Sequence, residues 1–334
     1  MKKLKTAIVG FGFMGKTHAL NVFRSGRMEL SAIVDADLNR IYQPGGNFDT
    51  GGIDTEILAA LPKYMTLEEC LEKETIDLVF ICVHTKLHYE MAKLSLERGA
   101  HVFVEKPFVL DIAEGEALVE EAKRRKRLLG VGHVVRFMPA YRKLREIYRS
   151  NTYGALKFIS LSRFSGVPDW GDWGKRQREF GSSGGALFDL VIHDIDFLHF
   201  LLGQPEKVES TFFGGALSPQ DYLSAFWRYA DRELQVKVEG GNTFHSKFPF
   251  EAGFKATFER ASLVWHSYDG TEIKVADHQE THSLPVENAN EGFREESEYF
   301  ARCIQEGQYP EACSGESALE TIRLCYRHVE QVND

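Results

Sequence analysis

The sequence contains no uninterrupted apolar run near the roughly 20 residues that a helix needs to cross a bilayer. Its basic start, followed by an apolar stretch, superficially resembles a signal peptide. That stretch is short, glycines interrupt it, and no small-x-small cleavage site follows it. We therefore interpret residues 1–15 as a first strand and turn, and we expect no membrane partner.

Cysteine is also scarce, and no CxxC pair occurs. An odd number of scattered cysteines gives no disulfide framework and no zinc-binding signature. This usage is typical of the reducing cytoplasm, where we expect the protein to reside. The five cysteines are Cys70, Cys82, Cys303, Cys313 and Cys325.

Positive charge is in deficit, because Lys and Arg number 40 against 49 Asp and Glu, which gives a net charge of −9. The isoelectric point from the sequence is about 5.8. A chain with this balance is not built for broad electrostatic binding of nucleic acid or anionic membrane. We therefore expect a small-molecule partner and no nucleic acid.

The length of 334 residues exceeds one ordinary core, so two domains are expected. Residues 1–134 alternate strand-like and helix-like segments, which predicts an α/β domain with a doubly wound parallel sheet. The strand-like runs are apolar on both faces, as in a sheet covered by helices. They are residues 5–10, 29–35, 77–83, 101–105 and 128–134.

The helix-like segments are residues 14–25, 66–74, 86–98 and 111–126. Residues 41–54, rich in Gly, Asn and Asp, are expected to form a surface loop where a helix is usual.

Residues 135–334 have a different pattern and predict an α+β domain. Helices are expected over residues 139–150, near 186–202, and at the end of the chain over 292–306 and 315–330. The strand-like segments are residues 156–164, 207–215, 223–229, 234–241, 253–266 and 271–277. Most of these strands follow one another without helices between them, so we expect a large, mostly antiparallel open sheet.

The hexapeptide GFGFMG, Gly10–Gly15, is a GxGxxG motif between a predicted strand and a predicted helix. In dinucleotide-binding sites the first glycine permits a tight turn, the second lets the backbone approach a pyrophosphate, and the third allows close packing. The helix N-terminus offers N–H groups and a positive dipole to phosphates. Asp35 ends the next strand, where a carboxylate accepts hydrogen bonds from the adenosine ribose and, with Asp37, repels a 2′-phosphate. This pattern favours NAD over NADP, against the alternative of a glycine turn without a ligand.

The hexapeptide FVEKPF, residues 103–108, places Glu105 and Lys106 side by side at the end of a buried strand. Desolvating an unpaired charge is costly, so a lysine there needs a reason. The carboxyl end of this strand is expected at the same sheet edge as the glycine turn, where ligands bind. A lysine held there by the stiff Pro107 can polarise a substrate oxygen. The alternative is a lysine that extends into solvent beside Glu105, and the hexapeptide leaves both readings open.

The third motif, Gly184–Gly203, predicts a helix that carries Asp189 and His193 four residues apart and therefore on one face. Asp194 and Asp196 fall on other faces. A histidine beside a carboxylate suits a general base, because its pKa lies near neutrality. A helix-surface ion pair is the alternative.

Two pairs have the i, i+4 spacing that metal ligands use: Asp189 with His193, and His84 with His88. The sequence shows no HExxH and no evident third ligand for either pair. We therefore expect no metal site.

Together these motifs resemble the glucose-fructose oxidoreductase / inositol 2-dehydrogenase / rhizopine catabolism (Gfo/Idh/MocA) family of nicotinamide-dependent oxidoreductases, nearly from end to end. Residues 87–108, LHYEMAKLSLERGAHVFVEKPF, match its LHxxxAxxAxxxGxHVxxEKP block. VGHVVRFMPAYRKL resembles its segment between domains, and GGALFDLVIHDID resembles its GGxxxDxxxHxxD helix. HDIDFLHFLLG is particularly similar to inositol dehydrogenase-like members, and the closing helices with EACSGESALETIRL are also typical.

The resemblance implies a Rossmann domain, NAD as cofactor, and a catalytic group of Lys106, Asp189 and His193. In that mechanism hydride passes from a carbinol carbon to the nicotinamide. His193 takes the hydroxyl proton, Asp189 orients the substrate or the histidine, and Lys106 polarises the oxygen. The implied cofactor-binding residues are Gly10, Phe11, Gly12, Phe13, Met14, Gly15, Asp35, Val83, His84, His88, Glu105 and Lys106. The implied substrate-binding residues are Lys106, Arg136, Trp173, Asp189 and His193.

The chain departs from the family in some places. The family often has Thr-Pro-Asn after its third strand, where this chain has Val83, His84 and Thr85. Residues 167–180 correspond to a variable loop near the substrate, and its Trp173, Arg176 and Arg178 would line the pocket or form a solvated rim. Arg136 stands where relatives often contact substrate, and an interdomain salt bridge is its alternative role.

The expected function is an NAD-dependent dehydrogenase of a cyclic polyol or sugar, inositol-like or a sugar derivative. One alternative is an NAD-dependent glycoside hydrolase that acts through transient oxidation. Another is a regulator that binds NAD and a sugar without turnover, although such regulators tend to lose the lysine or histidine that this chain keeps. The family resemblance also implies a homodimer or homotetramer formed through the C-terminal sheet, on which AFWRY and LVWHSY carry large apolar side chains.

Overall fold

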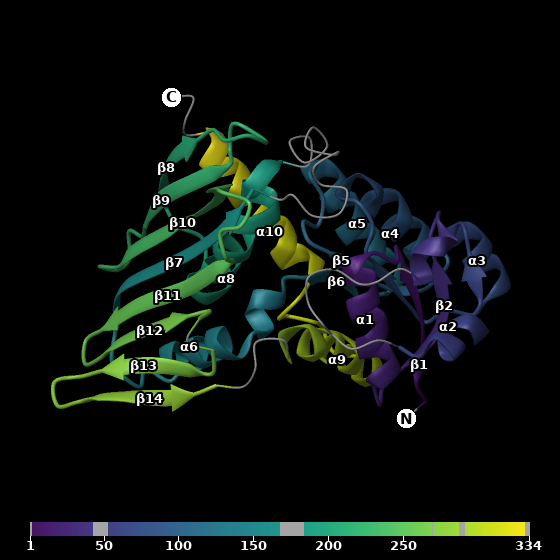
Figure 1. The fold of residues 1–334 in the computed structure, drawn as a ribbon, viewed down its shortest axis with the longest axis horizontal. Coiled ribbons are helices and arrows are strands. Elements are labelled where there is room, and N and C mark those ends of the chain that lie inside the picture. Colours follow the sequence, from purple (N-terminus) through teal and green to yellow (C-terminus); the bar gives the residue numbers. More distant parts are fainter. Residues whose placement is uncertain (1, 43–52, 168–183, 269, 287–290, 331–334) are drawn as a thin grey trace. The chain divides into compact units, whose positions relative to one another are not determined.

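In the computed structural model the chain divides into two compact units (Figure 1). The structure describes residues 2–42, 53–167, 184–268, 270–286 and 291–330. The first unit comprises Met1–His133 and Phe293–Glu320, and the second comprises Val134–Gly292 and Thr321–Asp334. The chain therefore builds most of the first unit, then the second, and afterwards returns to the first.

A six-stranded parallel sheet forms the centre of the first unit, in the order β3-β2-β1-β4-β5-β6. The direction of the order reverses between β1 and β4, which is the point where doubly wound sheets bind ligands. The expected parallel α/β domain is confirmed, with all five predicted strands and a short sixth, β3. The strands are β1 (Leu4–Val9), β2 (Met28–Val34), β3 (Lys63–Tyr64), β4 (Leu78–Ile81), β5 (His101–Glu105) and β6 (Leu129–Gly132).

Three helices of the first unit, α2, α3 and α5, begin at a side chain that caps them. Thr66 accepts a hydrogen bond from the Glu69 backbone and Asp111 accepts one from Ala113, which satisfies N–H groups that a helix start leaves unpaired. The four predicted helices are present, and a fifth, α2, was missed because it is short. The helices are α1 (Phe13–Arg24), α2 (Thr55–Ala60), α3 (Leu67–Lys73), α4 (His88–Glu97) and α5 (Ile112–Arg125). Of the glycine-rich segment 41–54, residues 43–52 lie outside the described part, and its first two residues end a 3₁₀ helix, Leu38–Tyr42.

Residues 293–320 belong to the first unit, although the sequence analysis assigned them to a domain of residues 135–334. They contain most of α9 (Glu291–Glu306) and the start of α10 (Gly315–Glu330). The Val131 backbone N–H on β6 donates to the carbonyl of Cys313 at 2.8 Å. The ring of Phe300 on α9 lies 5.5 Å from that of Phe103 on β5. The apolar periodicity predicted the helices, but periodicity does not say which core a helix covers.

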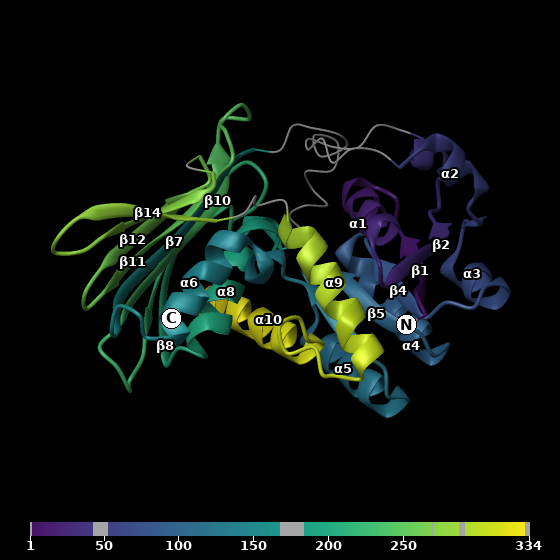
Figure 2. The same cartoon turned by 90° about the horizontal axis from the view of Figure 1, so that it is seen from below.

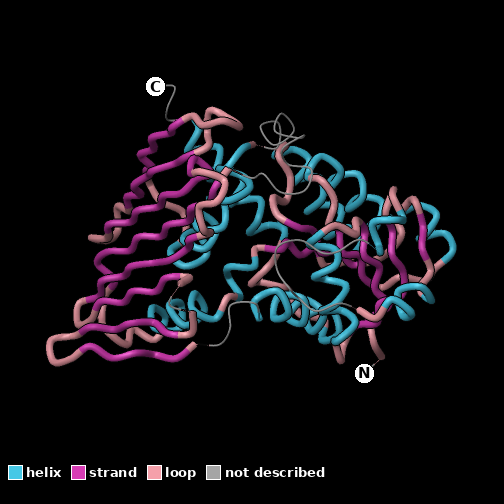
Figure 3. Tube along the Cα trace, in the orientation of Figure 1, coloured by secondary structure: helices cyan, strands magenta, loops and turns pink. Residues whose placement is uncertain are grey.

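The second unit contains an eight-stranded sheet in the order β14-β13-β12-β11-β7-β10-β9-β8 (Figure 3). Only the β7–β10 pair among these neighbours is parallel, so the expected mostly antiparallel sheet is confirmed. The strands are β7 (Leu156–Gly166), β8 (Lys207–Phe213), β9 (Tyr222–Arg228), β10 (Gln235–Phe244), β11 (Glu251–Phe258), β12 (Ser262–His266), β13 (Glu272–Ala276) and β14 (Thr281–Pro285). The predicted strand 253–266 is two strands, because a turn closed by Phe258 N–H and the Ala261 carbonyl reverses the chain.

Helices α6 (Pro139–Arg149), α8 (Ile192–Leu202) and α10 lie along one face of this sheet (Figure 2). Trp227 on β9 is buried on that face, and its Nε1–H donates to Nε2 of His328 on α10 at 3.1 Å. The neighbouring Phe226 points to the other face and is 45% exposed. The apolar side chains of AFWRY are thus divided between the core and the uncovered face. Among the described residues, no helix combines the length and apolarity needed to span a bilayer.

Candidate active site

The glycine turn between β1 and α1 has the geometry that a dinucleotide needs. Gly10 has a φ of +84°, which favours glycine. A Cβ on Gly15 would lie 1.8 Å from the Gly10 carbonyl oxygen, so only glycine lets the helix pack this closely. A Cβ on Gly12 would meet no atom within 4 Å. The turn is therefore closed on its protein side and open at Gly12, where a pyrophosphate would approach. No side chain caps α1, whose first residues are Phe13 and Met14.

Asp35 supports this turn from the end of β2. Its Oδ2 accepts the backbone N–H of Phe11 at 2.7 Å, and its Oδ1 accepts that of Asp37 at 2.8 Å. The residue is only 8% exposed. A carboxylate offers about four lone-pair positions, so these two bonds leave acceptors for ribose hydroxyls. Burial lowers the pKa of the nearby Lys16, against the opposing charge of Asp35.

Val83 and His84 follow β4 at the same sheet edge. A Cβ on Gly10 would lie 2.6 Å from the Cys82 carbonyl oxygen and 2.8 Å from Cγ1 of Val83, so the glycine turn packs directly on this segment. His84 is exposed at the start of a 3₁₀ turn. Both residues are therefore positioned near the expected cofactor site.

His88, in contrast, is buried beneath this edge. Its Nδ1 lies 3.0 Å from the Pro107 carbonyl oxygen and 3.1 Å from that of Phe108, and its Nε2 lies 3.0 Å from that of Val83. Both ring nitrogens are engaged with backbone, so we remove His88 from the cofactor-binding set. The spacing of residues in the sequence does not show whether a histidine faces a ligand or bonds to the protein backbone, as His88 does.

Glu105 and Lys106 end β5, and their environments differ. Glu105 is buried, its Oε1 lies 2.6 Å from Nε2 of His18 on α1, and its Oε2 accepts the backbone N–H of Lys106 at 3.2 Å. Lys106 is partly exposed, and the Lys106–Pro107 peptide bond is cis. The buried charge at the strand end is therefore that of Glu105, and His18 is its partner. Lys106 lies at the edge of the sheet where a ligand is expected.

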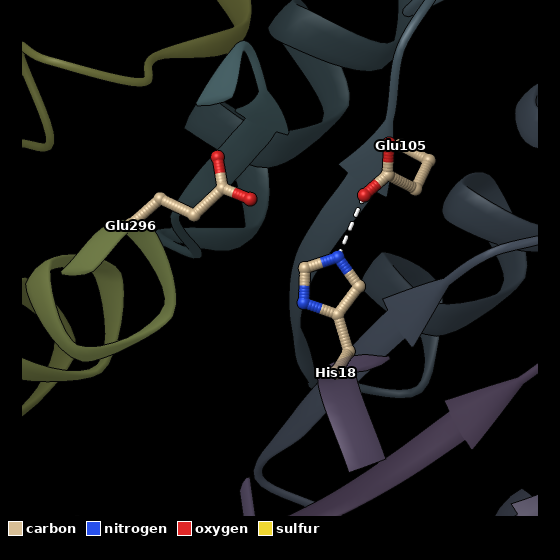
Figure 4. A group of neighbouring side chains, drawn as sticks. All are labelled: His18, Glu105 and Glu296. Atoms are coloured by element: carbon tan, nitrogen blue, oxygen red, sulfur yellow. Dashed lines mark hydrogen bonds and ion pairs between the residues drawn. The ribbon is translucent and has the colours of Figure 1, made fainter. Parts of the chain in front are cut away.

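A cluster that the sequence analysis missed adjoins Glu105. Potential ligand atoms of His18, Glu105 and Glu296 lie within 4.8 Å of one another (Figure 4). Figure 4 shows the Glu296 carboxylate, on α9, turned toward the other two side chains. Within the described structure neither Glu296 oxygen has a hydrogen-bond partner. Burial and the charge of Glu105 raise the pKa of Glu296 well above its ordinary value.

This cluster is the one group of three potential metal ligands in the described residues. An imidazole and two carboxylates form a ligand set that divalent cations accept. In the structure His18 and Glu105 bond to each other, and the raised pKa of Glu296 favours its neutral form. Its members come from α1, β5 and α9, and no local motif could have signalled them.

In the second unit, the Gly184–Gly203 segment forms a π-helical turn, Leu187–Val191, followed by α8. Asp194 and Asp196 are fully buried and each accepts two hydrogen bonds from one arginine. Arg163 Nε and Nη2 both lie 2.9 Å from Asp194, and Arg136 Nε lies 2.7 Å from Asp196. Burial raises the pKa of Asp194, although the charge of Arg163 opposes this. These two carboxylates therefore hold α8 in place.

Asp189 and His193 remain partly exposed, unlike Asp194 and Asp196. Asp189 lies within the π-helical turn, a feature that is frequent at functional sites. The structure therefore separates the Asp–His pair expected to do chemistry from the carboxylates that support the helix.

Two expected substrate contacts do not gain support. The Arg136 side chain is 0% exposed and bonded to both oxygens of Asp196, within the second unit, so it stabilises the fold there. This pair lies within the second unit, and a substrate contact of Arg136 stays a prediction. Trp173, together with Arg176 and Arg178, lies outside the described residues.

Comparisons with known proteins agree with this arrangement. A model described as "Oxidoreductase family, NAD-binding Rossmann fold" matches residues 4–133, and the "GFO/IDH/MocA C-terminal domain" model matches residues 141–276. A myo-inositol 2-dehydrogenase from Thermotoga maritima is 22% identical, over 97% of this chain and 94% of its own length.

Solved structures share the fold across the full length. A UDP-N-acetylglucosamine 3-dehydrogenase from Acidithiobacillus ferrooxidans has a TM-score of 0.80 at 19% identity, covering 99% of this chain and 98% of its own. An oxidoreductase from Agrobacterium radiobacter, solved with NAD⁺, L-tartaric acid and magnesium, has a TM-score of 0.82 at 16% identity, covering 100% of this chain and 97% of its own.

Proposed function

The chain belongs to the Gfo/Idh/MocA family of NAD-binding oxidoreductases, and we propose that it is an NAD-dependent dehydrogenase of a cyclic polyol or sugar. The observation that carries the proposal is the family match along both units, combined with an intact glycine turn and a lysine at the ligand-binding edge of the sheet. The inositol and sugar-nucleotide dehydrogenases among its relatives support a substrate with ring hydroxyl groups.

The first unit supplies the cofactor-binding groups. The open backbone at Gly12 and the start of α1 would receive the pyrophosphate, because helix N-termini attract phosphate. Asp35 would accept the ribose hydroxyls and disfavour a 2′-phosphate, which supports NAD over NADP. When bound, NAD supplies the hydride acceptor, and the protein contributes orientation and proton transfer.

The proposed catalytic residues are Lys106 of the first unit and Asp189 and His193 of the second. The Lys106 ammonium would donate a hydrogen bond to the reacting oxygen and stabilise the negative charge that grows there. His193 would accept the hydroxyl proton as a general base, and Asp189 would orient the imidazole or the substrate. Arg136 is left out of the substrate-binding set because of its burial.

We also propose that the protein works in the cytoplasm and self-associates through the uncovered face of the second sheet. The exposed Phe226 and Val264, which lie on that face among charged side chains, support an interface between copies. Sedimentation analysis of the wild type and of Phe226→Glu measures this directly. A monomeric wild type contradicts the proposed self-association.

The test of the enzymatic function is nicotinamide absorbance, with NAD and NADP separately, across inositols, aldoses, amino sugars and nucleotide sugars. Reduction of NAD by one compound class supports the proposal. Lys106→Met should then abolish turnover while NAD still binds. Lys123→Met is the matched control, because Lys123 is an exposed helix residue whose Nζ lies 3.4 Å from Glu316. Turnover by Lys106→Met at the wild-type rate contradicts the role of Lys106.

A further inference from the structure

His88 has an unusual set of hydrogen-bonding neighbours. It is 1% exposed, and its two ring nitrogens face three backbone carbonyl oxygens at 3.0–3.1 Å, those of Val83, Pro107 and Phe108. A carbonyl oxygen only accepts hydrogen bonds. All partners of the ring are therefore acceptors, on both of its sides.

This arrangement distinguishes the charge states of the imidazole. A neutral imidazole carries one N–H, so the lone pair of its other nitrogen would face a carbonyl oxygen at hydrogen-bond distance. Two oppositely directed acceptor groups at that distance repel each other. An imidazolium carries an N–H on each nitrogen and donates in both directions, which satisfies every atom of the group.

Electrostatics act in both directions on this ring. The net effect is a lowered pKa of His88, because burial, the largest cause, outweighs the three carbonyls and the charge of Glu105, which raise it. Glu105, at the end of β5, is the charged group that acts on the ring from the neighbouring elements. The hydrogen-bond geometry opposes this lowering, because charged donors form stronger hydrogen bonds than neutral ones and the backbone fixes the three acceptors.

The three carbonyls belong to two segments of the proposed active site. Pro107 and Phe108 follow Lys106 directly, and Val83 follows β4 where the glycine turn packs. The ring therefore joins the turn that carries Lys106 to the strand end that supports the cofactor site. Without this ring, the Pro107 and Phe108 carbonyls would lose their link to Val83.

We propose that His88 is a permanently protonated clamp and a positioning residue for Lys106, which it holds at the ligand-binding edge through the Pro107 and Phe108 carbonyls. This inference rests on the proposed function of Lys106. A core histidine in a neutral state, which only fills space, is the competing interpretation, and the two differ in charge and in their effect on catalysis.

The charge is measured by NMR of the wild-type protein with ¹⁵N-labelled histidine. We expect one of the 12 histidine rings to keep both nitrogens protonated at pH values above the ordinary histidine pKa of about 6.5. That signal should be missing from His88→Gln or, if this variant does not fold, from His88→Asn. A neutral tautomer for every ring at such a pH overturns the proposal without any variant.

The positioning role is measured by comparing His88→Gln with His101→Gln. His101 is a matched control, because it starts the strand that Lys106 follows and accepts a backbone hydrogen bond from Leu128 at 2.9 Å. We expect faster amide hydrogen exchange at Phe108–Leu110 in His88→Gln only. We also expect its kcat to fall about 10- to 100-fold with little change in KM, because small misplacements of catalytic groups have effects of this size.

Lys106→Met separates the two proposals. If it is inactive while His88→Gln keeps the wild-type kcat and exchange rates, the clamp is overturned and the proposed function stands. If Lys106→Met itself remains active, the proposed role of Lys106 fails, and the NMR and exchange measurements still decide whether His88 is a charged clamp.

Discussion

The Nε2 atom of His18 lies 2.6 Å from Oε1 of Glu105, and this buried pair leaves the neighbouring Glu296 carboxylate without a hydrogen-bond partner in the described structure. An ionised, unpartnered carboxylate in a protein interior is costly. Burial and the charge of Glu105 raise the pKa of Glu296 well above its ordinary value, so folding favours its protonated form.

This protonation predicts how stability changes with pH. In the unfolded chain a glutamate has a pKa of about 4.3. Because the folded pKa is higher, the protonated carboxyl contributes stability that is complete below the unfolded pKa and is lost as the pH rises through the folded pKa. We expect the midpoint of thermal unfolding to fall as the pH rises from the unfolded pKa through the folded pKa of Glu296. Glu296→Gln, which is permanently neutral, should remove this contribution to the pH dependence.

Glu298→Gln is the control for this measurement. Glu298 lies on the same helix, its side chain is 30% exposed, and it is 3.7 Å from Arg27. The control should keep the wild-type pH dependence. If Glu296→Gln also keeps it, Glu296 is not the protonated group. Metal found by elemental analysis of the wild type and absent from Glu296→Gln would assign the cluster to a cation instead.

Arg136 is expected to act on stability and not on substrate affinity. Arg136→Met leaves the fully buried Asp196 without its charged partner, although the Thr321 hydroxyl still donates to it at 2.8 Å. Breaking a buried pair in this way costs about 3–5 kcal/mol. Urea unfolding should show the loss, and Arg136→Leu combined with Asp196→Leu should recover much of it.

The exposed pair of Arg228 and Glu209 provides the contrast, because water screens the charges of an exposed ion pair. Arg228→Met should therefore change the free energy of unfolding little. An increase in KM for Arg136→Met without a loss of stability would restore this residue to the substrate site.

Asp35 is expected to decide cofactor preference. Asp35→Ser removes the charge that opposes a 2′-phosphate and keeps one acceptor for the Phe11 or Asp37 N–H. We expect weaker NAD binding and a higher ratio of NADP to NAD affinity, measured by titration of the intrinsic fluorescence. Asp77→Ser is the control, because Asp77 accepts the Lys5 N–H at 2.9 Å at the opposite end of the strands. An unchanged ratio in Asp35→Ser contradicts the assignment.

His193 is expected to act as the general base. His193→Asn should lower kcat about 10²- to 10⁴-fold, which is the usual contribution of such a group, and should leave NAD affinity unchanged. The decline of the wild-type rate at acidic pH, where a histidine base is protonated, should disappear. His199→Asn on the same helix is the control and should retain the wild-type profile. A wild-type-like pH profile in His193→Asn would assign the base to another residue.

The sequence by itself determined the features that depend on local backbone chemistry and on periodicity. Gly10 and Gly15 predicted the turn, because no other residue fits at these positions. The apolar runs predicted each long strand of the first sheet. The FVEKPF and Asp189–His193 motifs could be recognised because the spacing of their residues along the chain defines them, and their catalytic role stays a prediction. Short elements such as α2 and β3 escaped notice because a few residues show no clear period.

Only the tertiary structure decided how ionisable side chains are paired. It paired Asp194 with Arg163 and Asp196 with Arg136, and it surrounded the His88 ring with backbone carbonyls. It also placed most of α9 in the first unit and Glu296 close to Glu105. The physical reason is that burial and the identity of a hydrogen-bond partner depend on segments distant in sequence, and a charge acquires its role only when its neighbours in space are set.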